Sequence, residues 1–139
     1  MPHEYPDHPR VGVGVIVRRG DAVLLVRRGK PPGLGEWSLP GGSQELGETL
    51  FETAAREALE ETGVTVRPVS VLTGVDNIER DANGRVRFHY TIVDYCGRHA
   101  AGDARPGDDV SAIAWALPEE LPTFDLTPDV LRVIARARC

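Results

Sequence analysis

The sequence predicts an α/β fold in which a mixed β-sheet lies between helices. Runs of aliphatic and β-branched residues that are typical of strands recur along the chain. One amphipathic helix, expected over 49–63, interrupts these strands, and a second helix closes the chain. The length of 139 residues and the apolar content of 41% are enough for one domain with one core. We therefore expect an N-terminal arm at residues 1–10 and a single domain at 11–139.

A hairpin opens the predicted domain. Residues 11–18 and 22–28 are β-branched or aliphatic runs, and Gly20-Asp21 between them is typical of a tight turn. The arm before them has three prolines and little apolar content, so it is either flexible or wrapped around the domain. Cations follow the hairpin, and both phosphate binding and plain solvent exposure remain open for them: Arg27, Arg28 and Lys30.

A glycine-rich segment over 33–42 comes next. Gly41 and Gly42 follow Pro40, so the backbone there can adopt positive φ and approach a ligand closely. Main-chain carbonyls or amides would then face a metal ion or a phosphate. Trp37 in the same segment has two open roles, stacking on a nucleobase and packing beneath the loop.

The helix expected after this segment has clear end signals. Thr49 and Glu52 have the spacing of a capping box, and Gly63 stands where a left-handed C-terminal residue is expected. Between them a broad apolar arc can pack on a core; its members are Leu50, Phe51, Ala54, Ala55, Ala58 and Leu59.

Three carboxylates crowd one face of this helix. Glu57, Glu60 and Glu61 stand at i, i+3 and i+4, within an arc of roughly 100°. Like charges at that spacing lower helix stability unless a cation lies among them, and hard oxygen donors favour Mg²⁺, with Mn²⁺ as a substitute. Because the acids border the apolar arc, we expect them at the rim of a cleft.

The remaining elements alternate strands with turns. Residues 64–76 read as one or more strands, and Asn83-Gly84 predicts a type I′ turn into a strand over 85–95. Residues 110–117 supply a further strand. Thr127 and Pro128 have the pattern of an N-cap and first helical residue, which predicts a closing helix.

The stretch from Gly42 to Val64 resembles the Nudix box, Gx5Ex7REUxEExGU, in which U is apolar. Every specified position is filled: Gly42, Glu48, Arg56, Glu57, Ala58, Glu60, Glu61, Gly63 and Val64. The preceding Trp37, Pro40 and Gly41 also resemble the usual lead-in. The resemblance implies the α/β/α sandwich of that family and hydrolysis, with divalent cations, of a nucleoside diphosphate linked to another group.

The same resemblance implies roles for individual residues. The metal ligands would be Glu57, Glu61, Glu60 and the carbonyl of Gly41, and Arg56 would pair with Glu48 to fix the box. Glu57 would serve as ligand or general base, and a loop aspartate would assist. Turn formation is the competing role for the loop candidates, which are Asp103, Asp108 and Asp109; we take Asp109 as the catalytic candidate. Candidate substrate-binding residues are Arg27, Arg28, Trp37, Gly42 and Phe88.

The pattern most resembles ADP-ribose pyrophosphatases, which form AMP and ribose 5-phosphate. The sequence lacks the proline that such enzymes have some fifteen residues past the box, since residues 76–80 contain none. Nucleotide sugars and non-standard nucleoside triphosphates therefore remain open as substrates. A housecleaning hydrolase of nucleoside triphosphates and a non-catalytic nucleotide sensor are the alternative functions.

Composition bounds the partners. A net charge of −5 favours a small nucleotide over a nucleic acid polymer, which would require a basic face. No apolar run has the length of a membrane span and no signal-peptide pattern opens the chain. Cys96 and Cys139 do not indicate a disulfide framework and fit a reducing cytoplasm. Many Nudix relatives pair through the sheet or N-terminal strands, so the arm could serve a homodimer.

Overall fold

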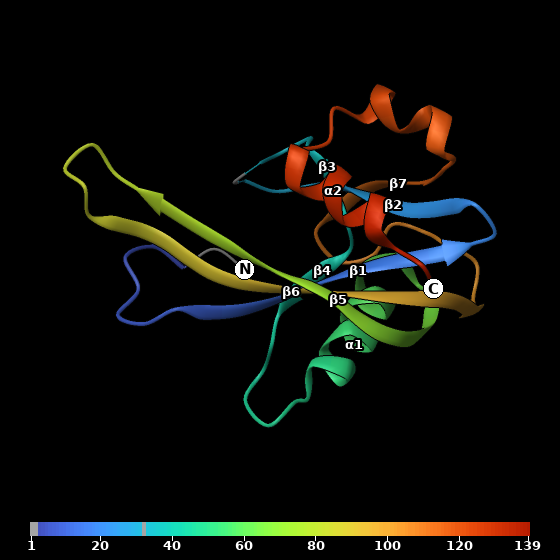
Figure 1. Ribbon diagram of the computed structural model, residues 1–139, viewed down its shortest axis with the longest axis horizontal. Helices are drawn as coiled ribbons and strands as arrows, with labels where there is room; N and C mark the ends of the chain where they lie inside the picture. The colour runs from blue at the N-terminus through green and yellow to red at the C-terminus, as the bar shows by residue number, and fades with distance from the viewer. Residues whose placement is uncertain (1–2, 32) are drawn as a thin grey trace.

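A seven-stranded sheet with helices on both faces forms the protein (Figure 1). The computed structural model describes residues 3–31 and 33–139, with the backbone alone at 68 and 69. Met1, Pro2 and Pro32 lie outside the described residues. The elements, in chain order, are β1 (Arg10–Arg19), β2 (Ala22–Arg28), β3 (Trp37–Ser38), β4 (Gly41–Ser43), α1 (Leu50–Thr62), β5 (Thr65–Arg80), β6 (Val86–Ala101), β7 (Val110–Ala116), the 3-10 helix η1 (Pro118–Phe124) and α2 (Pro128–Arg136).

The sheet is mixed, as the sequence predicted. Its main order is β3-β2-β1-β6-β5, while β4 pairs with β1 and β7 pairs with β2. Strands β1 and β6 run parallel, and the other strand pairings among the described residues are antiparallel. Strand β3 pairs with β2, and β4 pairs with the opposite end of β1. The short segment that joins β3 and β4 therefore crosses close to the centre of the sheet.

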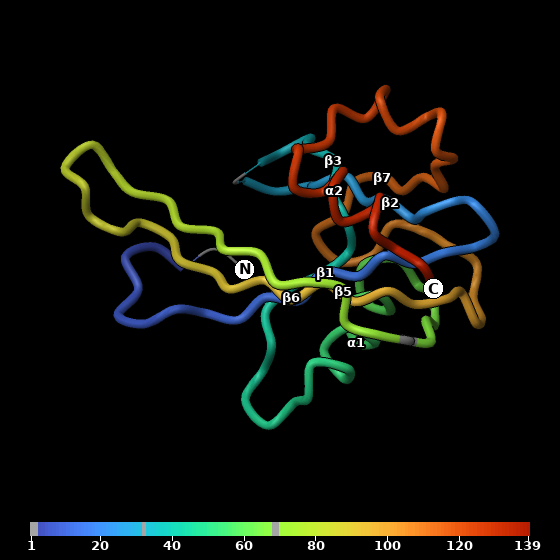
Figure 2. Tube along the Cα trace, in the orientation of Figure 1, coloured from blue at the N-terminus to red at the C-terminus, as the bar shows by residue number. Residues whose placement is uncertain are grey.

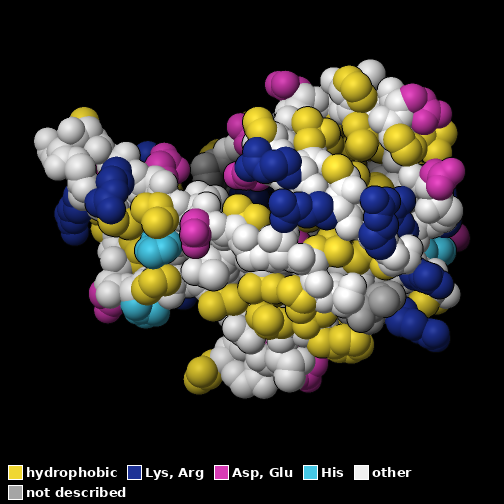
Figure 3. Space-filling model, viewed as in Figure 1, with side chains coloured by type: hydrophobic (Ala, Val, Ile, Leu, Met, Phe, Trp, Pro, Cys, Tyr) yellow, Lys and Arg dark blue, Asp and Glu magenta, His cyan; other side chains and the backbone are white. Residues whose placement is uncertain are grey.

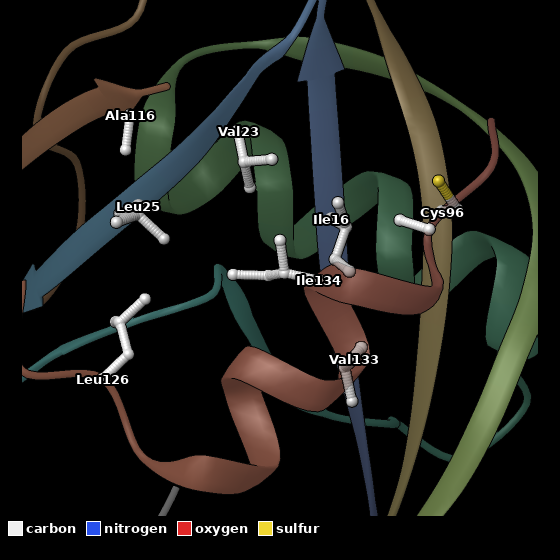
Figure 4. Close-up of a cluster of buried hydrophobic side chains, with 9 residues drawn as sticks. Ile16, Val23, Leu25, Cys96, Ala116, Leu126, Val133 and Ile134 are labelled. Atoms are coloured by element: carbon white, nitrogen blue, oxygen red, sulfur yellow. The ribbon is translucent and has the colours of Figure 1, made fainter. Parts of the chain in front are cut away.

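Alternation along β1 divides the core into two layers. Val13, Val15 and Val17 belong to a buried cluster that includes Ala54 and Ala58 of α1. On the opposite face Ile16 packs in a second cluster with residues of β2, β6 and α2, as Figure 4 shows. Both layers use strand and helix residues that the apolar patterns indicated, but Phe51 and Leu59 of the predicted helical arc do not join the core and are 50% and 53% exposed.

The N-terminal arm wraps along the hairpin of β5 and β6, which projects from the sheet (Figure 2). The backbone N–H of Tyr5 donates to the carbonyl of Arg87 at 2.7 Å, and its hydroxyl donates to Asp81 at 3.0 Å. Glu4 forms an ion pair with Arg87 at 3.2 Å. Of the two alternatives for the arm, the described part, from residue 3 onward, adopts the wrapped one.

The turn at the tip of this hairpin differs from the prediction. A type I′ turn needs positive φ at both central residues. Of the described residues in this turn, Gly84 has φ of 80°, but Asn83 is not in the positive region. The side chain of Asp81 instead accepts hydrogen bonds from the N–H groups of Asn83 and Arg85 at 2.9 and 3.0 Å. This aspartate turn was missed because the Asn-Gly pattern considers only the two central residues.

The two cysteines also differ from the prediction, because Cys96 and Cys139 form a disulfide bond. Their Cα atoms are 5.8 Å apart, within the range that a disulfide spans. The C-terminal segment after α2 returns over β6, and that tertiary contact could not be read from the 43-residue separation. None of the helices in the described part of the chain has both the length and the apolar character needed to cross a membrane.

Candidate functional site

The acidic helix α1 is held at both ends by the predicted caps. The Thr49 hydroxyl accepts from the Glu52 N–H at 3.1 Å, and the Glu52 carboxylate accepts from the Thr49 N–H at 3.0 Å. At the other end Gly63 has φ of 71° and donates its N–H to the Leu59 carbonyl at 2.9 Å. The helix register, and with it the direction of the carboxylates, is therefore fixed locally.

Arg56 connects the preceding loop to the carboxylates. Its Nε and Nη2 donate to the two oxygens of Glu48 at 2.6 and 2.9 Å, which is the pair expected from the sequence. Nη2 also donates to the Ser43 carbonyl at 3.0 Å. Nη1 donates to Glu57 at 2.7 Å and to Glu60 at 3.2 Å. The Arg56 guanidinium lowers the pKa of Glu48 to about 2, so Glu48 stays ionised and holds Arg56 in place.

Glu57 and Glu61 lie against the backbone of the glycine segment. The Gly41 N–H donates to Glu61 Oε1 at 2.8 Å. A side chain on Gly42 would collide with the Glu57 carboxylate, so a larger residue there would displace that carboxylate from its present position. Burial raises the pKa of Glu61 to about 7, and burial also raises the pKa of Glu57. Both carboxylates are thus held in surroundings that disfavour their negative charge.

These observations fit a divalent cation. Among the described residues, no three His, Cys, Asp or Glu side chains already converge as a ligand set. The donors are nevertheless hard oxygens, and a nearby cation would remove the cost of ionising Glu57 and Glu61. Glu60 is more exposed and contacts Arg56. The observed contact of Gly41 is through its amide, so a metal contact through its carbonyl stays a prediction.

A cavity of about 430 Å³ is lined by one of the helix carboxylates, that of Glu61. Glu61 and Arg28 lie at this cavity, and Gly12 and Gly14 of β1 also line it. Val130 of α2 contributes to its wall. The space therefore extends from the acidic helix across the sheet to α2, on a scale suited to a small ligand.

The predicted cationic and aromatic residues separate at β2. Arg28 lines the cavity and its charge lowers the pKa of Glu61, opposing the larger effect of burial. Arg27 instead donates to the Ser111 hydroxyl at 2.9 Å and lies 5.7 Å from the centre of the Trp37 ring. Trp37 packs edge-on against Phe124, with ring centres 5.0 Å apart. Neither Arg27 nor Trp37 is among the described cavity-lining residues, so the structure shows Trp37 packed, and its stacking on a nucleobase stays a prediction.

Phe88 lies beside the part of the hairpin that reaches the cavity, since its neighbour His89 pairs with the cavity residue Ile78. It pairs with Glu79 in the projecting hairpin, where Arg87 lies 5.1 Å from the centre of its ring. It is absent from the described residues that line the cavity. The sequence identified a strand aromatic but not its distance along β6 from the cavity residue Ile92.

The loop before β7 docks on the end of the acidic helix. Gly107 and Asp108 donate their N–H groups to the carbonyls of Glu61 and Glu60 at 2.8 and 3.1 Å. Asp109 has φ of 60° and forms an ion pair with Lys30 at 2.7 Å, which lowers the pKa of Asp109. Its negative charge contributes to the raised pKa of Glu61. The structure thus brings Asp109 near the carboxylates, while its catalytic role stays a prediction.

Asp94 lines the cavity but was not among the residues predicted for the site. This aspartate of β6 is 5% exposed, and burial raises its pKa to about 6. Its signal was present in the sequence, because it is an acid inside the apolar strand Thr91–Cys96.

The chain resembles known proteins over most of its length. The family model described as "NUDIX domain" matches residues 8–137. An ADP-ribose pyrophosphatase from Methanocaldococcus jannaschii is 37% identical over 73% of this chain and 58% of its own length. An 8-oxo-dGDP phosphatase from Homo sapiens is 30% identical over 91% of this chain and 38% of its own length. The chain therefore spans less than two thirds of either relative.

Solved structures share the fold. A MutT NUDIX hydrolase from Burkholderia pseudomallei has a TM-score of 0.81 and 30% identity, covering 95% of this chain and 100% of that one. The NUDIX domain of Shewanella oneidensis NrtR, complexed with ADP ribose, has a TM-score of 0.75 and 27% identity, covering 94% of this chain and 86% of that one. The α/β/α arrangement is thus common to all of them.

Proposed function

Because this chain belongs to the Nudix hydrolase family, we propose that it is a Mg²⁺-dependent pyrophosphohydrolase that cleaves ADP-ribose into AMP and ribose 5-phosphate. Family members act on nucleoside diphosphate derivatives. The proposal depends above all on Glu61, a largely buried carboxylate that lines a cavity of about 430 Å³. ADP-ribose is supported by the archaeal relative's name and by the bound ligand of the NrtR domain.

The metal would be held by Glu57 and Glu61, with Glu60 and the Gly41 carbonyl completing the set. A bound divalent cation neutralises pyrophosphate charge and acidifies water. Arg56 orients Glu57 and is itself held by Glu48. These contacts keep the helix carboxylates aimed at the glycine segment before any ligand enters.

Hydrolysis adds one water across the P–O–P bridge. The water oxygen bonds to one phosphorus, the bridging oxygen leaves with the other, and a protein group takes the released proton. Glu57 is our candidate for that base when it is not itself a ligand, and Asp109 assists from the loop. Arg28 at the cavity supplies positive charge for the phosphates.

A housecleaning hydrolase of nucleoside triphosphates is the second candidate. The human relative is named for a diphosphate, 8-oxo-dGDP, so its name supports an oxidised guanine nucleotide but not the triphosphate itself. A triphosphatase would release pyrophosphate with a nucleoside monophosphate, so the products separate it from the first candidate. A non-catalytic sensor is less favoured, since every acid of the box is present.

The test is a substrate panel with Mg²⁺, compared by kcat/KM and by product analysis. It includes ADP-ribose, sugar nucleotides, NADH, dinucleoside polyphosphates and oxidised nucleoside triphosphates. We expect ADP-ribose to give AMP and ribose 5-phosphate, and we expect Glu61→Gln to lose this activity. Glu119→Gln changes an exposed acid outside the site and is the matched control. A clear preference for a triphosphate would replace the ADP-ribose assignment.

A homodimer through the arm and the projecting hairpin is our proposal for assembly. Exposed apolar side chains are visible on this hairpin in Figure 3. Ile78 is 48% exposed and Tyr5 of the arm is 38% exposed. A second copy of the chain could cover both side chains. Light scattering should give twice the chain mass, and deletion of residues 1–9 should give the monomer mass. A monomeric full chain would contradict this assembly.

A further inference from the structure

The Asp94 side chain is a largely buried acid that lines the cavity. It is 5% exposed, and no hydrogen bond or ion pair to it occurs among the described residues. Burial is the cause of its raised pKa, with no charged neighbour contributing. Since buried polar groups are normally paired, an unpaired carboxylate lining a cavity indicates that its partner belongs to a ligand.

Two glycines give this carboxylate its place. Asp94 is the register partner of Gly14 in the parallel pairing of β6 with β1. A side chain on Gly14 would collide with the Asp94 carboxylate, so the absence of a side chain leaves the acid room over β1. Gly14 is in turn paired with Gly41, whose N–H donates to Glu61. Gly14, which lies beside Asp94, is therefore about one strand spacing, roughly 4.8 Å, from Gly41, which contacts Glu61.

The cavity around Asp94 has partly apolar walls. Leu39, Val75 and Val130 line it from the glycine segment, β5 and α2. Such walls limit access of water to the carboxylate, which strengthens any hydrogen bond that a ligand donates to it. The ligand group at this position must supply hydrogen-bond donors and must lie close to the phosphate end of the site.

We propose that Asp94 accepts hydrogen bonds from the 2′- and 3′-hydroxyls of a ribose 5-phosphate unit whose phosphate lies at the Glu61 end of the cavity. A carboxylate has two acceptor oxygens, and vicinal hydroxyls present two adjacent donors. The sugar joins the phosphate to the base, so its hydroxyls are nearer the phosphate than the polar edge of the base is. This inference rests on the proposed function, because ADP-ribose contains two such units, one in the nucleoside and one at the terminal sugar.

Asp94 is thus a specificity-determining residue for ribose over 2-deoxyribose. A deoxy ligand would leave one carboxylate oxygen buried without a donor, and sites built around a hydroxyl discriminate strongly for that reason. The neighbouring Gly14 contributes only by leaving space for the Asp94 carboxylate.

Calorimetric titration of product-like ligands tests the inference with Mg²⁺ present. AMP is compared with 2′-deoxy-AMP, and ribose 5-phosphate with 2-deoxyribose 5-phosphate. The wild type should bind the ribose form of at least one pair tenfold or more tightly, and the pair that shows this preference identifies which ribose is held. Asp94→Asn should reduce that preference to below threefold, whereas the exposed turn variant Asp21→Asn should retain it.

Equal affinity of the wild type for both members of both pairs would overturn the inference, without requiring any variant to fold. Full retention of the ribose preference in folded Asp94→Asn would also overturn it. Binding of these ligands is measured without turnover. Failure to hydrolyse ADP-ribose would therefore reject the proposed function, while the ribose preference would still be decided by the binding data alone.

Discussion

Glu61→Gln should make the metal-free protein more stable at alkaline pH. Burial raises the pKa of Glu61 from 4.5 to about 7, so the folded protein favours its protonated form. The stability gained from protonated Glu61 is fully present below about pH 4.5 and is lost as pH rises through about 7. Glutamine does not ionise, and its carbonyl can still accept from the Gly41 N–H that Glu61 now accepts.

The magnitude follows from the size of the pKa change. One pKa unit corresponds to about 1.4 kcal/mol, so a shift from 4.5 to about 7 corresponds to about 3 kcal/mol at alkaline pH. We therefore expect the free energy of unfolding of Glu61→Gln to exceed that of the wild type by up to about 3 kcal/mol near pH 8. Near pH 4.5 the difference should almost disappear, because Glu61 is then protonated in the folded state.

Urea unfolding in the presence of a chelator measures both free energies. Glu119→Gln, at an exposed position, controls for a general effect of removing one negative charge. If Glu61→Gln were destabilised by the same amount at both pH values, the account of Glu61 as a buried and uncompensated acid would be refuted. Saturating Mg²⁺ should narrow the difference near pH 8, since the cation stabilises the ionised wild type.

Three further variants test other contacts. Arg56→Lys cannot make the two-point contact with Glu48, so kcat/KM should fall roughly 10- to 100-fold, measured by steady-state kinetics; unchanged turnover would exclude a positioning role. Gly42→Ala crowds Glu57 and should raise the Mg²⁺ concentration for half-maximal activity roughly tenfold, since outer contacts of a metal site affect affinity on that scale; an unshifted Mg²⁺ titration would contradict the contact. Cys139→Ser opens a link across 43 residues, so the free energy of unfolding should fall by up to about 4 kcal/mol; equal sensitivity of wild type and variant to a reductant would contradict the disulfide.

Local sequence signals predicted the elements that carry the acids. Thr49 with Glu52 at one end and Gly63 at the other each act within about one turn of their own helix end, so these local signals define the bounds of α1. The pairing of Arg56 with Glu48 was also accessible, because both lie within the same loop-helix unit. Fixed spacing along a helix converts directly into geometry.

Features that depend on strand partners could not be predicted in this way. The room for Asp94 exists because Gly14 of β1 lies beside it in parallel register, and these residues are far apart in the chain. The placement of Phe88 in the projecting hairpin and the contact of Cys139 with Cys96 are likewise set by tertiary packing. A single sequence gives the residue types but not the strand register or the path of the C-terminal segment.

Titration of Mn²⁺ into the folded protein, with free Mn²⁺ followed by electron paramagnetic resonance, most directly tests the claim that the helix carboxylates hold a divalent cation. We expect the wild type to bind Mn²⁺ near neutral pH and the double variant Glu57→Gln with Glu61→Gln to lose this binding while remaining folded. Binding by the folded double variant with the affinity of the wild type would contradict the account.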